Sequence, residues 1–317
     1  MLVWYQLASA IVLTTVKGYL ESQTPIAALV FQNIQYRRKL FNEMGETAAL
    51  ETKPQLSLVI PAYNEAGRIE PTLKDLMFTL ERKFKFNENY ELLIIMDGCE
   101  DGTPEIVKAI IKNHLSVSAI VLPNRLGKGG AIMEALKYAK GDLIAFIDAD
   151  GSIPSIELSR LIKLTDQYDL VIGSRYAKTS VLPFRRPLTR FLFSRSFNVL
   201  LGLLFWRLRN IKDTQCGVKI FTKKLIDVVN GELLISDFAF DVNLIYSALF
   251  HGFKVKEVGV TWIEKDGSKL SHGFYKQSVF MAFSLLRLRI YYSYLNKILE
   301  SKTFAKIADV LQAWLNS

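Results

Sequence analysis

Two aspartates follow a short apolar stretch near the middle of the chain. Asp148 and Asp150 come directly after residues 143–147, whose composition is typical of a buried strand. Side chains two residues apart on an extended chain point to the same side, so both carboxylates can serve one site. Neighbouring carboxylates repel each other unless a cation lies near them. Oxygen ligands suit Mg²⁺ or Mn²⁺, which also coordinate substrate phosphates. The pair therefore predicts a divalent metal that neutralises charge on a leaving diphosphate.

Three other loops carry residues suited to a nucleotide. Residues 61–65 (PAYNE) close one apolar run, Asp97 closes a second, and residues 125–130 (RLGKGG) precede a helical stretch. The glycines permit close backbone approach, and Lys128 at a helix N-terminus favours an anion. The last stretch is not a P-loop, because no Ser or Thr follows Lys128. An aromatic side chain, acids, a lysine and a metal pair together suit a nucleotide diphosphate.

Alternating strands and helices must position these loops. The pattern predicts helices between short apolar strands, with Thr103 capping a helix that has Pro104 at its first position. This order predicts a doubly wound α/β fold with a mostly parallel sheet. Ligands bind such sheets beyond the carboxyl ends of the strands, which is where the four loops fall. The predicted strands cover residues 56–61, 90–96, 117–122, 142–148, 168–173 and 255–260, and the predicted helices cover 66–84, 128–139 and 238–250.

Composition limits the class of protein and of partner. The chain has 317 residues, half of them hydrophobic, and 40 Lys and Arg against 31 Asp and Glu give a net charge of +9. Two cysteines are too few for a disulfide framework or a zinc cluster, which fits a reducing cytosolic setting. A basic excess suits nucleic acid, a lipid surface or a phosphorylated substrate. Six arginines between residues 185 and 209 accompany an apolar run, which favours a membrane over nucleic acid.

Three parts of the chain are candidates for membrane contact: the N-terminal region, residues 187–206 and residues 274–299. Residues 2–16 are apolar but shorter than the roughly 20 needed to span, and they lack the features of a signal peptide. With residues 25–31 they predict a helix that lies on or dips into a membrane; packing on the domain or on a soluble partner is the alternative. Residues 187–206 predict a long helix, either buried or in contact with the membrane. Residues 274–299 predict a basic amphipathic helix.

From about Leu56 to Leu270 the chain resembles the family 2 glycosyltransferases of the GT-A fold. Within that family it is most similar to polyprenyl-phosphate sugar transferases, especially the dolichyl-phosphate β-glucosyltransferases. The resemblance divides the chain into a membrane-associated helical segment (1–50), a GT-A domain (51–270) and a C-terminal amphipathic segment (271–317). It is carried by residues 60–65, 127–131, 148–151, 173–176, 213–221, 239–242, Trp262, Glu264 and 267–270.

The resemblance implies roles for individual residues. Asp148, Ala149 and Asp150 would hold the metal and the donor, with Asp150, Asp241 and Arg175 as the catalytic set. The donor nucleotide would contact Pro61, Tyr63, Asn64, Glu65, Asp97 and Lys128, and the acceptor phosphate would contact Arg175, Arg190 and Ser194. Ser152 stands where mannosyl-transferring relatives have a glutamine, which leaves the metal two protein ligands. Met96 and Cys99 depart from an acid and a serine common in the family.

These roles imply inverting transfer of a hexose to dolichyl or polyprenyl phosphate by a membrane-associated enzyme whose active site faces the cytoplasm. Glucose from UDP-glucose is favoured. A phosphate monoester is already anionic and needs no strong base, so catalysis would rest on positioning and on stabilising the leaving diphosphate. A sugar hydroxyl would need a general base to take its proton, with Asp241 or Asp237 as candidates. The alternatives are an enzyme that uses GDP-mannose, a transferase that extends a glycan, and a non-catalytic membrane protein that binds nucleotide sugars. Nucleic acid is not an expected partner.

Overall fold

The computed structural model describes residues 53–83, 90–112, 114–183, 197–237, 239–265 and 274–300. Arg190, Ser194, the predicted membrane-associated segment 1–50 and the segment 267–270 lie outside the described residues.

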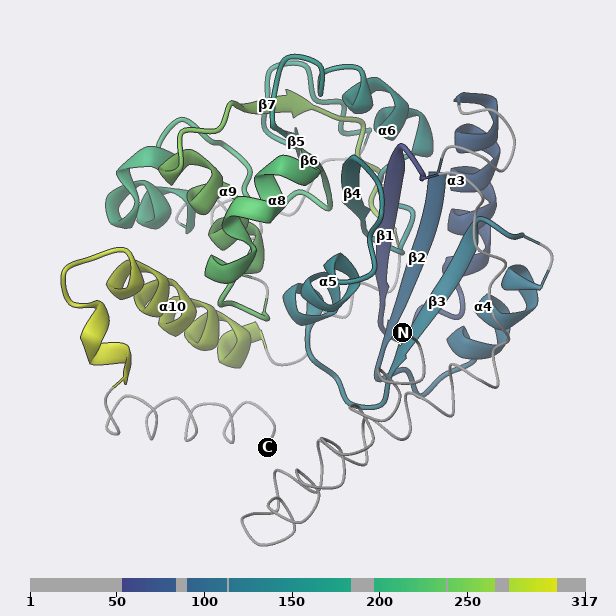
Figure 1. The fold of residues 1–317 in the computed structure, drawn as a ribbon, viewed down its shortest axis with the longest axis horizontal. Helices are drawn as coiled ribbons and strands as arrows, with labels where there is room; N and C mark the ends of the chain where they lie inside the picture. Colours follow the sequence, from purple (N-terminus) through teal and green to yellow (C-terminus); the bar gives the residue numbers. More distant parts are fainter. Residues whose placement is uncertain are drawn as a thin grey trace, which may run out of the picture. The chain divides into compact units, whose positions relative to one another are not determined.

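Seven strands in the described part of the chain form one sheet, in the order β3-β2-β1-β4-β6-β5-β7 (Figure 1). β6 runs antiparallel to its neighbours β4 and β5, and the other neighbouring pairs are parallel. The predicted α/β fold with a mostly parallel sheet is therefore confirmed. The strands are β1 (Leu56–Ala62), β2 (Tyr90–Asp97), β3 (Val117–Leu122), β4 (Leu143–Ile147), β5 (Leu170–Ser174), β6 (Val218–Thr222) and β7 (Val255–Gly259).

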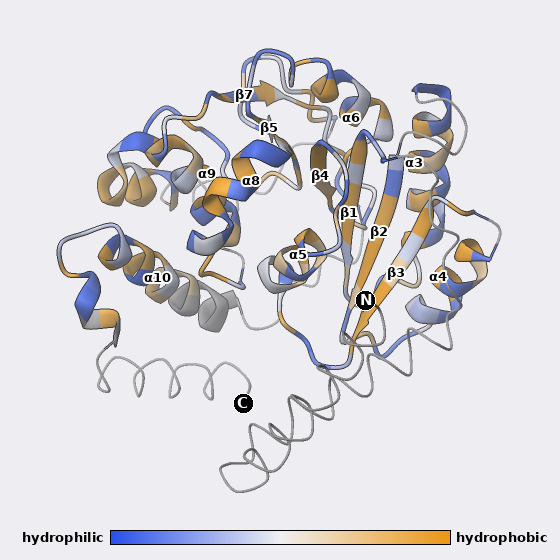
Figure 2. Cartoon of the chain, viewed as in Figure 1, coloured by the Kyte–Doolittle hydropathy of each residue, from blue (hydrophilic) through white to orange (hydrophobic). Residues whose placement is uncertain are grey.

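Helices cover both faces of the sheet because successive strand side chains point to opposite sides. Val59 and Phe146 belong to one buried hydrophobic cluster, which includes residues of α5, α8, α9 and α10. Leu58 and Ile147 belong to a second cluster, with residues of α3, α4 and α6. Figure 2 shows β1 and β2 as largely hydrophobic, as expected for strands buried on both faces. The helices are α3 (Ile69–Lys83), α4 (Thr103–Ile111), α5 (Lys128–Leu136), α6 (Ser155–Ile162), α8 (Lys223–Val229), α9 (Phe240–Phe250) and α10 (Phe274–Tyr291), and the short 3-10 helices are Trp206–Leu208, Asn230–Glu232 and Asn296–Glu300.

The predicted cap of α4 was wrong by one residue. Pro104 lies in the first turn, but Gly102 is the N-cap and Thr103 is already helical. The Thr103 hydroxyl accepts a hydrogen bond from the backbone nitrogen of Glu65 at 2.8 Å and donates to Asp101. The threonine therefore joins the loops after β1 and β2 instead of capping its own helix.

The segments predicted to touch a membrane are described in part. Residues 197–204 are helical, and Val199, Leu200 and Leu203 on this helix are exposed. α10 packs on the domain through Leu285 and Leu288, which share a hydrophobic cluster with α5 and α9. In the part of the chain that the structure describes, every helix is too short or too polar to cross a bilayer.

Candidate active site

The four predicted loops meet at one edge of the sheet. They follow β1, β2, β3 and β4, which are neighbours and all parallel. The chain runs outward from β1 to β2 and β3 and then returns to β4 on the other side of β1. Such a reversal is where doubly wound sheets bind ligands. The loop that begins at Tyr63 and the loop that begins at Asp148 flank this position.

Four side chains of alternating charge form a row that ends at Asp148. Lys128, the first residue of α5, places its Nζ 2.8 Å from Asp148 Oδ1 and 3.8 Å from Asp241 Oδ2. On the far side of Asp241, Lys219 Nζ lies 2.5 Å from Oδ1. Burial alone would lower the pKa of Lys128, but the two carboxylates outweigh it and raise the pKa, so the side chain remains a cation. The predicted donor lysine and metal aspartate are therefore in direct contact.

Close packing between α5 and α9 brings Lys128 and Asp241 together. A Cβ atom at Gly129 would lie 2.4 Å from the Phe240 Cβ, so only glycine permits this approach. Lys128 precedes Gly129 in α5, and Asp241 follows Phe240 in α9. The contact between the two helix starts therefore places both charged residues at the end of β4.

Asp148 and Asp150 follow β4 as predicted, and both are partly exposed. The Asp148 carboxylate lies against Gly217, where a Cβ atom would be only 2.1 Å from Oδ2. Asp150 Oδ1 accepts a hydrogen bond from the backbone nitrogen of Ser152 at 2.9 Å. Their oxygens are of the kind that Mg²⁺ and Mn²⁺ prefer, so the donor set fits either ion. Among the described residues no group of three or more acids, histidines and cysteines gathers as a metal site.

The loop after β1 is held by contacts with the next loops. The Arg125 guanidinium lies 3.9 Å from the centroid of the Tyr63 ring, which is a stacking distance. Asn64 adopts a left-handed conformation with φ of 54°, and its side-chain oxygen accepts a hydrogen bond from Glu100 at 2.7 Å. Glu65 forms a two-point ion pair with Arg68 at 2.7 and 2.8 Å.

Three other residues were predicted to contact the donor nucleotide. Pro61 stands near the end of β1, and Ala149 is buried in the hydrophobic core. Asp97 ends β2, and its carboxylate accepts hydrogen bonds from the backbone nitrogens of Leu126 at 2.6 Å and Gly127 at 2.9 Å. Burial raises the pKa of Asp97 despite these bonds. Asp97 thus holds the loop that carries Lys128, while its predicted contact with the nucleotide stays a prediction.

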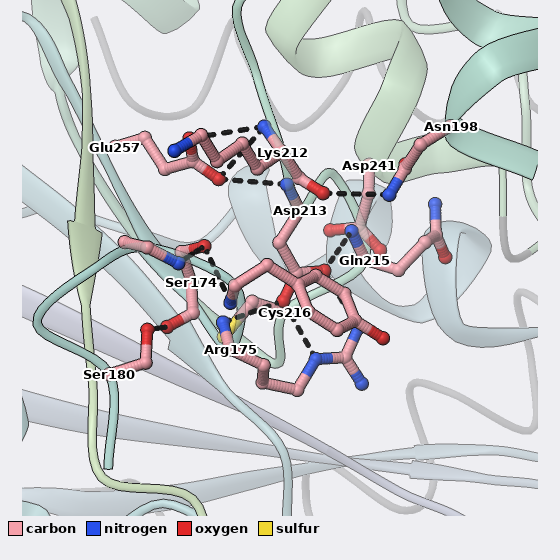
Figure 3. Close-up of polar contacts among 12 residues, drawn as sticks. Ser174, Arg175, Ser180, Asn198, Lys212, Asp213, Gln215, Cys216, Asp241 and Glu257 are labelled. Carbon is pink, nitrogen blue, oxygen red and sulfur yellow. Dashed lines mark hydrogen bonds and ion pairs between the residues drawn. The ribbon is translucent and has the colours of Figure 1, made fainter. Parts of the chain in front are cut away.

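Arg175 follows β5 and is clamped by Asp213 (Figure 3). Its Nε and Nη2 atoms each lie 2.7 Å from an Asp213 oxygen, and its backbone nitrogen donates to Asp213 at 2.8 Å. Glu257 on β7 in turn accepts a hydrogen bond from the Asp213 backbone nitrogen at 2.7 Å. Burial alone would raise the pKa of Asp213, but the charge and hydrogen bonds of Arg175 outweigh it and lower the pKa. The predicted phosphate-binding arginine therefore has two nitrogens engaged by a carboxylate.

Both candidate general bases have hydrogen-bond partners, but only Asp241 is fully buried. Asp241 is 1% exposed and faces two lysines. Asp237 accepts hydrogen bonds from the Ala239 backbone nitrogen at 2.6 Å and from the Ser284 hydroxyl, and burial raises its pKa. Both carboxylates therefore already accept hydrogen bonds from groups of the protein itself.

Three site residues had no role in the sequence prediction. Lys219 could have been suspected, because it is a lysine within the apolar strand β6. Thr214 Oγ1 and Gln215 Nε2 are buried without a hydrogen-bond partner, which nothing in the sequence indicates. Beside them, burial raises the pKa of the Cys216 thiol to about 12, which makes it a poor nucleophile.

The fold and the site define an α/β enzyme whose strand-end carboxylates and lysine suit an anionic ligand. Residues 57–229 match the model of Glycosyl transferase family 2, and the chain belongs to this family of glycosyltransferases. It is 32% identical to the dolichyl-phosphate beta-glucosyltransferase of Dictyostelium discoideum, over 75% of this chain and 74% of the relative. It is 33% identical to the human protein of the same name, over 68% of this chain and 69% of the relative.

Solved structures share the fold. Glucosyl-3-phosphoglycerate synthase from Mycobacterium tuberculosis, in complex with UDP, superposes with a TM-score of 0.57 and 18% sequence identity, covering 78% of this chain and 84% of that one. The same enzyme with Mn²⁺, UDP-glucose and glycerol 3-phosphate gives a TM-score of 0.54 at 17% identity, covering 78% and 83%. At this identity the likeness establishes the arrangement of strands and helices only.

Proposed function

We propose that this glycosyltransferase transfers glucose from UDP-glucose to dolichyl phosphate with inversion. The observation that carries the proposal is the similarity to dolichyl-phosphate beta-glucosyltransferases over about three quarters of the chain, combined with the Asp148–Asp150 pair at the carboxyl end of β4. The UDP and UDP-glucose complexes of the structural neighbours support a uridine nucleotide.

Asp148 and Asp150 would hold the divalent metal, which supplies charge neutralisation for the departing diphosphate. Lys128 lies beside this pair, and the start of α5 directs backbone N–H groups toward the same edge of the sheet. The Tyr63 ring, stacked on Arg125, would contact the nucleotide. Complexes of a structural neighbour with Mn²⁺ and with Mg²⁺ support either ion here.

The surroundings of the two candidate bases, Asp241 and Asp237, favour a phosphate acceptor over a sugar hydroxyl. A phosphate monoester attacks as an anion, whereas a hydroxyl needs a base to take its proton. Asp241 is buried and paired with Lys219, and the partly buried Asp237 accepts hydrogen bonds from the Ala239 backbone and the Ser284 hydroxyl. Arg175 would grip the phosphate only with the part of its guanidinium that faces away from Asp213. Arg190 and Ser194 remain predicted partners of the same phosphate.

A membrane surface would present the lipid acceptor, with the active site on the cytoplasmic side. Leu203 and Trp206 are 79% and 69% exposed, next to the exposed Val199 and Leu200. The Arg209 guanidinium stacks 3.4 Å from the Trp206 ring centroid. Bulky apolar side chains beside a cation suit the headgroup region. Flotation with anionic liposomes should be weakened by Leu203→Ser, and unchanged flotation would remove this surface from the proposal.

A donor screen tests the proposed reaction. Purified protein with Mn²⁺ and dolichyl phosphate should form β-linked lipid-phosphate glucose from UDP-glucose, and much less product from UDP-galactose or GDP-mannose. A preference for GDP-mannose would replace the donor assignment. Transfer to a soluble glycan but not to the lipid would replace the acceptor, and nucleotide binding without turnover would indicate a non-catalytic role.

A further inference from the structure

We propose that Lys128 is an exchangeable counter-ion: it neutralises Asp148 when the donor is absent, and it moves to the diphosphate when metal and donor bind. The proposal rests on the proposed function, because it concerns the same metal and diphosphate. It adds that Lys219 and Asp241 form a fixed pair whose purpose is to position Lys128. Lys219 is thus a positioning residue, which does not itself touch the substrate.

The distances show that the four charges are not equivalent. Lys219 and Asp241 are 0% and 1% exposed and lie 2.5 Å apart, so they form a closed pair in the core. Lys219 also donates to the Cys216 backbone oxygen at 2.9 Å, which leaves it little freedom to turn. Lys128 lies farther from Asp241, at 3.8 Å, and is closer to the partly exposed Asp148. The outer contact, between Lys128 and Asp148, is the one that can open.

Like charges make the outer contact incompatible with a bound metal. A divalent ion on Asp148 would lie about 2.1 Å from a carboxylate oxygen, and the Lys128 ammonium is already 2.8 Å from Oδ1. Two cations that share one carboxylate repel strongly at this distance. A diphosphate supplies the additional negative charge that lets Lys128 leave Asp148 and still be neutralised. The metal and the nucleotide should therefore bind cooperatively.

The surroundings let Lys128 exchange partners without losing its position. Both ammonium groups also lie near one aromatic ring: Lys128 Nζ and Lys219 Nζ are 5.5 and 5.2 Å from the centroid of the Phe146 ring. Asp241 remains beside Lys128 as a weaker second counter-charge. The stem of Lys128 is anchored at the start of α5, where Gly129 packs on Phe240. Only the end of the side chain needs to move.

Lys128→Met tests the exchange, because it keeps the stem and removes the charge. The variant should fold, since Lys219 still neutralises the buried Asp241 and the Asp148 carboxylate is 38% exposed. Lys74→Met is the matched control: it removes the same charge from an exposed pair with Glu70 on α3. Lys128→Gln is a second variant with the same expectation, and thermal unfolding checks that all the variants are folded.

The readout is Mn²⁺ binding, measured by electron paramagnetic resonance with and without UDP. Lys128→Met should bind Mn²⁺ without nucleotide about tenfold more tightly than wild type, and UDP in saturating Mn²⁺ about tenfold more weakly. Lys74→Met should change neither affinity. Unchanged or weaker Mn²⁺ binding by both Lys128 variants without UDP would overturn the proposal. If wild type retains no Mn²⁺ even with UDP, the metal role in the proposed function fails, and the exchange fails with it.

Discussion

Gly217→Ala should lower the activity of the enzyme about 100-fold while leaving its fold intact. A Cβ atom there would lie 2.1 Å from Asp148 Oδ2 and 2.6 Å from Cγ, whereas ordinary van der Waals contact begins at 3.4 Å. The carboxylate must therefore shift by roughly 1 Å or more, and a displacement of that size can cost about 100-fold in rate. The backbone tolerates the change, because Gly217 does not have positive φ.

The assay compares transfer from UDP-glucose, Mn²⁺ affinity and the free energy of unfolding for Gly217→Ala and a control. Gly231→Ala is the control, since a Cβ atom there meets nothing within 4 Å. We expect kcat/KM to fall about 100-fold in Gly217→Ala, with a loss of unfolding free energy below about 2 kcal/mol. Full activity in Gly217→Ala would refute the reasoning that Asp148 needs its present position.

Three further substitutions test separate parts of the site. Asp150→Asn should abolish transfer and leave the thermal midpoint within a few degrees of wild type; retained activity would remove its metal role. Asp213→Asn should cost about 3 kcal/mol of unfolding free energy at pH 7, because it leaves Arg175 buried without its partner. The pKa of Asp213 is lowered in the folded state, so the ionised carboxylate adds to the free energy of unfolding. This contribution is fully present above a pH of about 4, and it is lost as the pH falls through the folded-state pKa. The difference in unfolding free energy between Asp213→Asn and wild type, measured by denaturant titration, should therefore become smaller at acidic pH. Thr214→Val should change the unfolding free energy by less than about 1 kcal/mol, since the hydroxyl has no partner; a larger loss would reveal one.

The order of strands and helices was predictable because it depends on local patterns. Apolar runs ending in Pro61, Asp97 and Asp148 have the length and composition of buried strands, and the loops that follow them fall at one edge of any parallel sheet. The cap of α4 was mispredicted because the Thr103 hydroxyl bonds to a residue 38 positions away in sequence. The spacing of residues within the helix gives no sign of a contact with a residue so far away in sequence.

The partners of the charged residues were not predictable for the same reason. Sequence reasoning placed Lys128 and Asp148 in one site, but the pairing of Lys219 with Asp241 depends on β6 inserting antiparallel between β4 and β5. The clamp of Asp213 on Arg175 likewise joins residues 38 positions apart. Each of these long-range pairs changes the chemistry inferred for a residue, Asp241 or Arg175, that the sequence had already assigned to the site.

The most direct test of the proposed reaction is the lipid product itself. Purified protein, dolichyl phosphate, Mn²⁺ and UDP-glucose labelled in the sugar should yield labelled dolichyl-phosphate glucose, identified by mass spectrometry, and chelation of the metal should stop its formation. Absence of labelled lipid with protein shown to be folded by thermal unfolding, or undiminished formation after chelation, would contradict the proposed reaction.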